Sequence, residues 1–279
     1  MVNYNGTLVK EDSNKVFENR SFLYGDGVFE TCKICDNKIL FFEDHYFRLM
    51  ASMRIVRMEI PMFYTMEYLE EQILSTVKAN GFQDSARVRL TVFRNQGGRY
   101  LPDSNMVSFV IQSESLPHKE YVLSTDHYEV DLFKDYHIAK QLLSTLKTTS
   151  KMIHVVGSIY AKENGLQNCL LLNEDKNVVE ALQGNLFLLS GNTLITPPLS
   201  DGCQNGIQRK NLLQICRDFS DIEVNERSIS PFELQKADEL FVTNVIQGIQ
   251  PISKYRKREF GSKFAARLIT KINSQLFPC

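Results

Sequence analysis

A regular alternation of apolar and polar residues runs through 86–93, which reads Ala-Arg-Val-Arg-Leu-Thr-Val-Phe. Side chains of a strand point alternately to opposite faces, so this pattern predicts a half-buried β-strand. Shorter segments bounded by turn residues predict further strands. These lie at residues 29–34, 39–42, 106–112, 122–130, 168–172, 178–179, 186–189, 193–195 and 239–243. The fold must therefore be built around β-sheets.

Helical patterns separate these strands. Residues 66–80 place Leu69, Ile73 and Val77 at helical spacing, and Asp44 has the character of an N-cap for an earlier helix. Further helices are predicted at 152–164, at 208–219 and from about residue 263. This mixture of elements predicts an α+β fold class.

The chain is long enough for two domains, and a stretch with Pro117 suggests where they divide. We expect an N-terminal α/β domain over 1–116, a linker over 117–124 and a larger C-terminal domain over 125–279. With 43% hydrophobic residues, each domain can bury a core without a disulfide or a metal.

Charge and apolar runs exclude several classes of function. The net charge is −1, and the densest basic run, 254–258, is short, so a nucleic-acid partner is not expected. No apolar run approaches the about 20 residues that cross a bilayer, and residues 1–6 do not resemble a signal peptide. No membrane partner is therefore expected, and the six irregularly spaced cysteines predict a cytoplasmic protein.

Cys32 and Cys35 form a C-x-x-C pair, which is typical of redox or zinc sites. The pair lies in a predicted strand, where residues three apart point to opposite faces, and no second pair completes a zinc cage. We expect neither a metal site nor redox chemistry here.

Two charged residues have surroundings that favour chemistry. Lys147 lies among apolar and hydroxyl residues, where burial would free its amine as a nucleophile. Glu180 follows the apolar pair Val178 and Val179, and a buried carboxylate there would need a cationic partner such as a protonated pyridine nitrogen. Taken singly, most lysines of this kind are surface residues, and a carboxylate at the end of a short apolar strand is often solvated.

Three further features could bind a phosphate. Gly206 precedes a predicted helix whose first backbone N–H groups are free. Thr243 and Asn244 follow an apolar strand, and Arg48 offers a forked guanidinium. Each feature alone is also typical of a cap or a surface charge.

Taken in chain order, these features resemble the class IV aminotransferase family, which includes branched-chain and D-amino-acid aminotransferases and aminodeoxychorismate lyase. The resemblance spans about residues 1–255. It is carried by Tyr24-Gly25-Asp26-Gly27-Val28-Phe29-Glu30, His45-x-x-Arg48-Leu49, Lys147, Glu180-x4-Asn185-Leu186-Phe187, Thr196-Pro197-Pro198, Gly206-Ile207-x-Arg209 and Ala237-Asp238-Glu239-Leu240-Phe241.

The resemblance implies a two-domain fold-type-IV enzyme that uses pyridoxal 5'-phosphate, with a mixed, barrel-like sheet in the C-terminal domain. It implies that Lys147 opens a short helix, binds the cofactor as a Schiff base and shuttles a proton, and that Glu180 pairs with the pyridine nitrogen. The implied phosphate ligands are Arg48, the amides of Ile207 and Gln208, and Thr243 with Asn244. Phe29 would line the substrate pocket.

The resemblance also implies a homodimer, and Arg99 of a glycine-rich loop is expected to reach a substrate carboxylate, across the dimer interface or within one chain. The chain departs from the family pattern at Gln208, where relatives often have threonine, at residues 181–184 and at residues 148–150.

The reaction is left open between two chemistries. We favour transfer of an amino group between an amino acid and a 2-oxo acid. The alternative is a 4-amino-4-deoxychorismate lyase that yields 4-aminobenzoate and pyruvate for folate synthesis, because residues 97–99 and 205–207 look like those of lyases. A non-catalytic protein that kept the fold is a third hypothesis.

Overall fold

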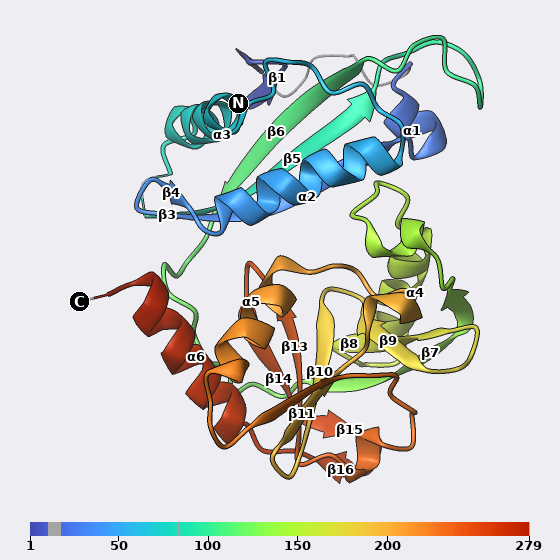
Figure 1. Cartoon of the computed structure of the whole chain (residues 1–279), viewed down its shortest axis with the longest axis vertical. Helices are drawn as coiled ribbons and strands as arrows, with labels where there is room; N and C mark the ends of the chain where they lie inside the picture. Colours follow the sequence, from blue (N-terminus) through green and yellow to red (C-terminus); the bar gives the residue numbers. More distant parts are fainter. Residues whose placement is uncertain (11–17, 83, 279) are drawn as a thin grey trace. The chain divides into compact units, whose positions relative to one another are not determined.

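The computed structural model describes residues 1–10, 18–82 and 84–278 (Figure 1). Its contacts divide the chain into two units, one of Met1–Lys119 with Lys147–Ser150, the other of Glu120–Leu146 with Lys151–Cys279. The predicted domain boundaries at 116 and 125 stay a prediction. Domain boundaries drawn along the sequence cannot show that the later segment Lys147–Ser150 belongs with the first unit.

The first unit is a six-stranded antiparallel sheet with the order β2-β1-β6-β5-β3-β4 (Figure 1). Its strands are β1 (Val2–Tyr4), β2 (Thr7–Val9), β3 (Gly27–Cys35), β4 (Lys38–Ile39), β5 (Ser85–Arg94) and β6 (Val107–Ser115). The helices are α1 (Arg20–Tyr24), α2 (Phe42–Ile55) and α3 (Met66–Ala79). The predicted strands at 29–34, 86–93 and 106–112 and the helix at 66–80 are confirmed.

One face of this sheet carries the core. Val88 and Leu90 of β5 pack in one apolar cluster with Leu49 of α2 and Ile73 of α3. Because strand side chains alternate, the neighbouring residues Arg87, Arg89 and Thr91 of β5 and Phe29 of β3 lie on the opposite face. The alternation that first identified β5 thus separates a helix-covered face from a face with polar groups.

The start of α2 corrects a prediction. Asp44 is in the first turn of the helix, and Phe41 takes the N-cap position in a left-handed conformation, with φ of 56°. The hairpin at Asp36 and Asn37 is tight and β4 is only two residues long, so the chain turns into the helix earlier than expected. Asp44 still interacts favourably with the positive end of the helix dipole.

The second unit contains two five-stranded sheets (Figure 1). One has the order β16-β15-β7-β8-β9, made of β7 (Glu129–Ile138), β8 (Asn168–Asn173), β9 (Val178–Ala181), β15 (Lys254–Tyr255) and β16 (Arg258–Glu259). The other has the order β12-β11-β10-β13-β14, made of β10 (Asn185–Ser190), β11 (Thr193–Thr196), β12 (Glu223–Glu226), β13 (Glu239–Asn244) and β14 (Gly248–Ile252).

Both sheets contribute to one apolar cluster, in which Val130 and Leu170 pack with Leu186 and Leu240. Parallel pairs (β7 with β8, β11 with β12) occur beside antiparallel ones, so the predicted mixed sheet structure and the α+β fold class are confirmed. The helices of this unit are α4 (Met152–Glu163), α5 (Ile207–Arg217) and α6 (Lys263–Leu276), with short 3-10 turns η1 (Leu142–Thr145), η2 (Leu199–Asp201) and η3 (Leu234–Lys236).

The strand predicted at residues 122–130 is wrong in position, because β7 begins only at Glu129. The preceding segment is bonded to a helix instead of a strand. The backbone N–H of Tyr121 donates to Asn273 Oδ1 of α6, and Asn273 Nδ2 donates to the Tyr121 carbonyl, at 3.1 and 2.8 Å. A side chain of α6 therefore satisfies backbone groups that a strand partner would otherwise take.

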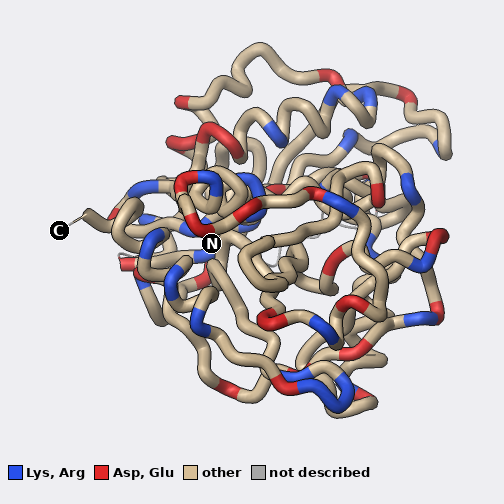
Figure 2. Tube along the Cα trace, turned by 60° about the horizontal axis from the view of Figure 1, so that its bottom comes forward, with Lys and Arg blue, Asp and Glu red and all other residues tan. Residues whose placement is uncertain are grey.

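Charges of both signs are interspersed along the trace (Figure 2). None of the described helices combines the length and the apolar character needed to cross a membrane.

Candidate active site

Lys147 lies in an extended segment that pairs with the beginning of β3. The N–H of Phe29 donates to the Lys147 carbonyl at 2.8 Å, the N–H of Thr149 donates to the Gly27 carbonyl at 2.9 Å, and Val28 forms an antiparallel bridge with Thr148. The expectation that Lys147 opens a helix is wrong, because η1 ends at Thr145 and α4 begins at Met152. The backbone of Lys147 is held by a hydrogen bond to β3.

The side chain of Lys147 lies over an aromatic ring. Lys147 Nζ is 4.4 Å from the centroid of the Phe29 ring, and Arg89 Cζ is 3.6 Å from the same centroid. A ring quadrupole attracts cations in this arrangement. Two cations therefore gather at Phe29, on the face of the sheet that α2 and α3 do not cover.

Arg89 is a candidate that the motifs did not identify. Its Nε donates to Thr91 Oγ1 at 3.2 Å, and no carboxylate among the described residues forms a salt bridge with it. Burial, with the nearby charge of Arg87, lowers the pKa of the Arg89 guanidinium. A partly buried arginine without an acid partner is suited to an anionic ligand. The sequence feature that could have identified Arg89 is the alternation along β5, which puts Arg87 and Arg89 on one face.

Arg48 makes a contact that the phosphate hypothesis did not include. Its Nε donates to Glu30 Oε1 at 2.8 Å, its Nη2 bonds to Glu30 Oε2, and His45 Nδ1 lies 2.7 Å from Glu30 Oε2. Burial alone would raise the pKa of Glu30, but the charge and hydrogen bonds of Arg48 and His45 outweigh it and lower that pKa to about 2. Burial lowers the pKa of His45. Glu30 thus neutralises much of the charge that Arg48 could offer to a phosphate.

Arg99 lies in a loop anchored by a buried arginine. Arg20 Nη1 donates to the carbonyls of Gly97 and Arg99 at 2.8 and 2.7 Å, and Arg20 Nε donates to Asp26 Oδ2 at 2.8 Å. Arg94 Nε reaches the same Asp26 oxygen at 3.0 Å. The Asp26 of the Gly-Asp-Gly motif therefore supports the loop that presents Arg99.

In the second unit, Glu180 of β9 is a buried carboxylate held by one backbone N–H and one histidine nitrogen. The Gln204 N–H donates to Glu180 Oε2 at 2.8 Å, and His154 Nε2 lies 3.3 Å from Glu180 Oε1. Asn185 Nδ2 donates to the Gln204 carbonyl at 2.8 Å. The Glu-x4-Asn spacing thus lets two residues, at the end of β9 and the start of β10, bind the N–H and the carbonyl of Gln204 just before α5.

The first turn of α5 forms a cradle for an anion. The N-cap is Gly206, which has no capping side chain, and a Cβ there would lie 2.0 Å from Asn185 Oδ1. Ile207 and Gln208 supply the first N–H groups, which have no partner within a helix. Gln208 is only 1% exposed, and within the described part of the chain neither Nε2 nor Oε1 of its amide has a hydrogen-bond partner. A phosphate fits this turn, because it would satisfy the helix amides and accept from the orphaned Nε2.

Thr243 and Asn244 close the adjacent strand β13 and have local partners. Thr243 Oγ1 donates to the Gly248 carbonyl at 2.7 Å. Asn244 Oδ1 accepts from the N–H groups of Ile246 and Gln247, and Asn244 Nδ2 donates to Gln183 and Gln247. The Asn244 side chain is therefore used in its own turn, whereas Thr243 Oγ1 can still accept a hydrogen bond.

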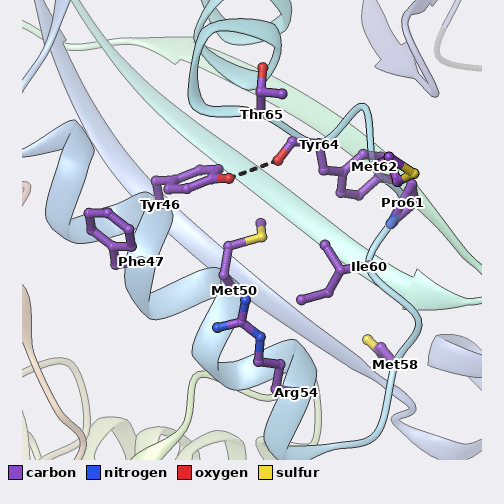
Figure 3. Close-up of a pocket in the computed structure, with 10 residues that line it drawn as sticks. All are labelled: Tyr46, Phe47, Met50, Arg54, Met58, Ile60, Pro61, Met62, Tyr64 and Thr65. Atoms are coloured by element: carbon purple, nitrogen blue, oxygen red, sulfur yellow. Dashed lines mark hydrogen bonds between the residues drawn. The ribbon is translucent and has the colours of Figure 1, made fainter.

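Other expected sites can be placed as well. Cys32 and Cys35 are buried free thiols in β3, and the described residues contain no group of three His, Cys, Asp or Glu side chains arranged for a metal. A pocket of about 520 Å³ lies between α2 and the segment before α3, where Tyr46 donates to the Tyr64 carbonyl (Figure 3). None of the predicted site residues lines it.

Comparison with known proteins identifies the family. The chain belongs to the class IV aminotransferase family, whose model matches residues 27–255. A protein of Methanocaldococcus jannaschii assigned as a branched-chain-amino-acid aminotransferase is 27% identical over 273 residues, 97% of this chain and 93% of the relative.

Two solved structures have the same fold. The branched-chain aminotransferase of Thermoproteus uzoniensis, solved with norvaline, has a TM-score of 0.85 and 26% identity, covering 98% of this chain and 93% of that one. The 4-amino-4-deoxychorismate lyase of Pseudomonas aeruginosa has a TM-score of 0.83 and 23% identity, covering 100% of both chains. The predicted family, its fold and its dependence on pyridoxal phosphate are confirmed, and the relatives support an aminotransferase better than the lyase.

Proposed function

We propose that Lys147 carries the cofactor of this aminotransferase and that Glu180 and the first turn of α5 bind the cofactor's ring nitrogen and phosphate. The observation that carries the proposal is Glu180. Within the described residues no lysine or arginine forms a salt bridge with this carboxylate, although it is 4% exposed. A buried carboxylate without a cation of its own is suited to a cationic ligand group such as a protonated pyridine nitrogen.

When bound, pyridoxal phosphate supplies an electron sink for negative charge at the Cα of an amino acid. Lys147 Nζ would accept the proton from that Cα, and in a transamination it would return the proton to the cofactor. Phe29 supports this role because its ring lies against the lysine side chain and keeps the amine in a partly apolar setting. The other proposed phosphate ligands are Arg48, Ile207, Gln208, Thr243 and Asn244.

For the substrate we propose an amino acid whose carboxylate is bound by Arg89. The guanidinium of Arg89 and the amine of Lys147 lie at the same aromatic ring, 3.6 and 4.4 Å from its centroid. A substrate carboxylate bound by Arg89 would hold the amino acid near Lys147. Arg99, on its anchored loop, is a second arginine for a carboxylate. The branched-chain aminotransferases among the relatives favour an apolar side chain on the substrate.

A lyase acting on aminodeoxychorismate is the second candidate. The fold likeness to the Pseudomonas aeruginosa lyase and the segments at 97–99 and 205–207 favour it. Both reactions would use Lys147 for proton transfer, and they differ in whether pyruvate leaves the substrate.

We also propose that the enzyme is a cytoplasmic homodimer. Met152, Val155 and Ile159 are exposed at successive turns of α4 and form an apolar stripe that a second copy would cover. The five described cysteines are buried free thiols, which suits a reducing compartment.

The test is a visible absorbance spectrum of the purified protein with pyridoxal phosphate, before and after adding D- and L-amino acids one at a time. Loss of the cofactor's visible band with one amino acid, together with formation of its 2-oxo acid, supports transamination and identifies the donor. A band that persists with every amino acid, while aminodeoxychorismate yields pyruvate, would transfer the assignment to the lyase.

A further inference from the structure

Glu180 has a partner that the family motifs do not include. His154, in the first turn of α4, places Nε2 3.3 Å from Glu180 Oε1. An ionised carboxylate can only accept hydrogen bonds, so His154 Nε2 must carry the proton in this pair. We propose that His154 is a positioning residue, which holds the Glu180 carboxylate in the orientation that the cofactor's ring nitrogen requires.

The two oxygens of Glu180 are held from different elements. His154 of α4 binds Oε1, and the Gln204 N–H, from the segment before α5, binds Oε2. Two donors on separate oxygens fix the plane of a carboxylate, which a single donor leaves free to rotate. Gln204 is itself fixed by Asn185, so its N–H donor is a rigid part of the backbone. His154 supplies the only donor of the two that a side-chain substitution removes.

The role depends on the proposed cofactor site. The hydrogen bond of His154 to Oε1, together with that of Gln204 to Oε2, prevents rotation of the Glu180 carboxylate away from that site. Each oxygen keeps acceptor capacity for a further donor. A carboxylate held in one orientation binds a protonated ring nitrogen more tightly than a rotating one, so His154 affects both cofactor affinity and the electron demand of the ring.

The chain provides a matched control on its surface. His127 Nε2 lies 3.3 Å from Glu129 Oε2, the same separation as in the proposed pair. The side chain of His127 is 61% exposed, whereas that of His154 is 20% exposed. Exposed pairs contribute little because water screens them. A substitution at His127 removes an equivalent pair that has no relation to the proposed site.

The experiment compares His154→Ala, His154→Gln and His127→Ala with the wild type. Pyridoxal phosphate affinity is measured by calorimetric titration of cofactor-free protein, the visible spectrum is recorded at saturation, and melting temperatures of the cofactor-free proteins report on folding. We expect His154→Ala to weaken cofactor affinity about tenfold or more and to shift the visible band, because a hydrogen bond to a charged group is lost. His154→Gln restores most of both properties, since its amide can donate, and His127→Ala matches the wild type.

The outcomes separate the two proposals. A wild type that takes up no pyridoxal phosphate would overturn the proposed cofactor site, and the role of His154 with it. A wild type that binds the cofactor while His154→Ala shows unchanged affinity and spectrum would overturn the positioning role alone. If His154→Ala lowers the melting temperature too far for titration, His154→Gln is measured instead. A Gln variant that melts like the wild type but binds the cofactor weakly and lacks the wild-type spectrum would contradict the proposal.

Discussion

Two buried carboxylates, Glu30 in the first unit and Glu180 in the second, have opposite surroundings. Glu30 is 2% exposed and bonded to the guanidinium of Arg48 and the ring of His45. Glu180 is 4% exposed and has one backbone N–H and one histidine nitrogen as donors. The burial is nearly equal, and the difference is that an arginine bonds to Glu30, whereas no lysine or arginine of the described residues forms a salt bridge with Glu180.

This difference separates a structural acid from a candidate functional one. The partners of Glu30 neutralise it within the protein, so its pairing contributes to the stability of the first unit. Glu180 has donors that orient it, but no lysine or arginine of the described chain forms a salt bridge with it. A buried carboxylate that has no lysine or arginine partner in the protein is suited to a cationic ligand.

The largest expected effect is on catalysis at Glu180. Glu180→Gln keeps the shape of the side chain and removes the charge, so we expect kcat to fall by about a hundredfold or more, because the ring nitrogen loses the partner that keeps it protonated. The stability of the cofactor-free protein should not fall, since a neutral group is buried at lower cost. Steady-state kinetics with denaturant unfolding checks both; unchanged kcat would contradict the proposed role.

Glu30→Gln should show the reverse pattern, a loss of stability. A Glu whose folded pKa of about 2 lies below its ordinary 4.5 stabilises the protein above pH 4.5, and that contribution is lost as the pH falls toward 2. The free energy of unfolding of the wild type should therefore drop by about 3 kcal/mol over this window. Urea unfolding at several pH values tests this, with the Glu30→Gln variant showing a much flatter profile. A wild type without such a drop would show that the Glu30 pair adds no stability.

Arg89→Gln should raise the KM for the amino-acid donor about tenfold and leave protein stability nearly unchanged, because Arg89 has no acid partner among the described residues. Arg87→Gln is the matched control, since Arg87 is on the same strand face and has Glu114 as a partner at 2.9 Å. An equal change in KM for the two variants would argue against a specific role for Arg89.

The smallest expected effect concerns Gln208. Gln208→Leu should weaken pyridoxal phosphate affinity by a few fold, because one donor to the phosphate is lost. The cofactor-free protein should be as stable as the wild type or slightly more stable, since an orphaned buried amide is removed. Calorimetric titration and thermal unfolding measure the two effects, and a marked loss of apo-protein stability would mean that the amide has a structural partner.

Sequence patterns predicted much of the fold because a strand or helix with one buried face has apolar residues at regular intervals in the sequence. The alternation at 86–93 identified β5, and the spacing of Leu69, Ile73 and Val77 identified α3. The strand predicted at 122–130 begins only at Glu129, and just before that range Tyr121 is bonded to Asn273, 152 positions away. No local pattern contains that information.

The candidate site likewise contains residues that the sequence could identify and contacts that it could not. Lys147 and Glu180 could be singled out by residue type and by their place in the family motifs. The pairing of Arg48 with Glu30 depends on how α2 packs on β3. The extended backbone at Lys147 depends on its bond to Phe29 and on that of Thr149 to Gly27. His154 and Arg89 belong to no motif, and only the folded chain shows what they contact.

The most direct test of the central claim is chemical trapping at Lys147. The protein is incubated with pyridoxal phosphate and reduced with sodium borohydride, which makes a lysine–cofactor bond permanent, and its peptides are then examined by mass spectrometry. The account predicts a pyridoxyl phosphate adduct on Lys147, absent from Lys147→Ala. An adduct on another lysine, such as Lys151 four residues further on, or no adduct at all, would contradict it.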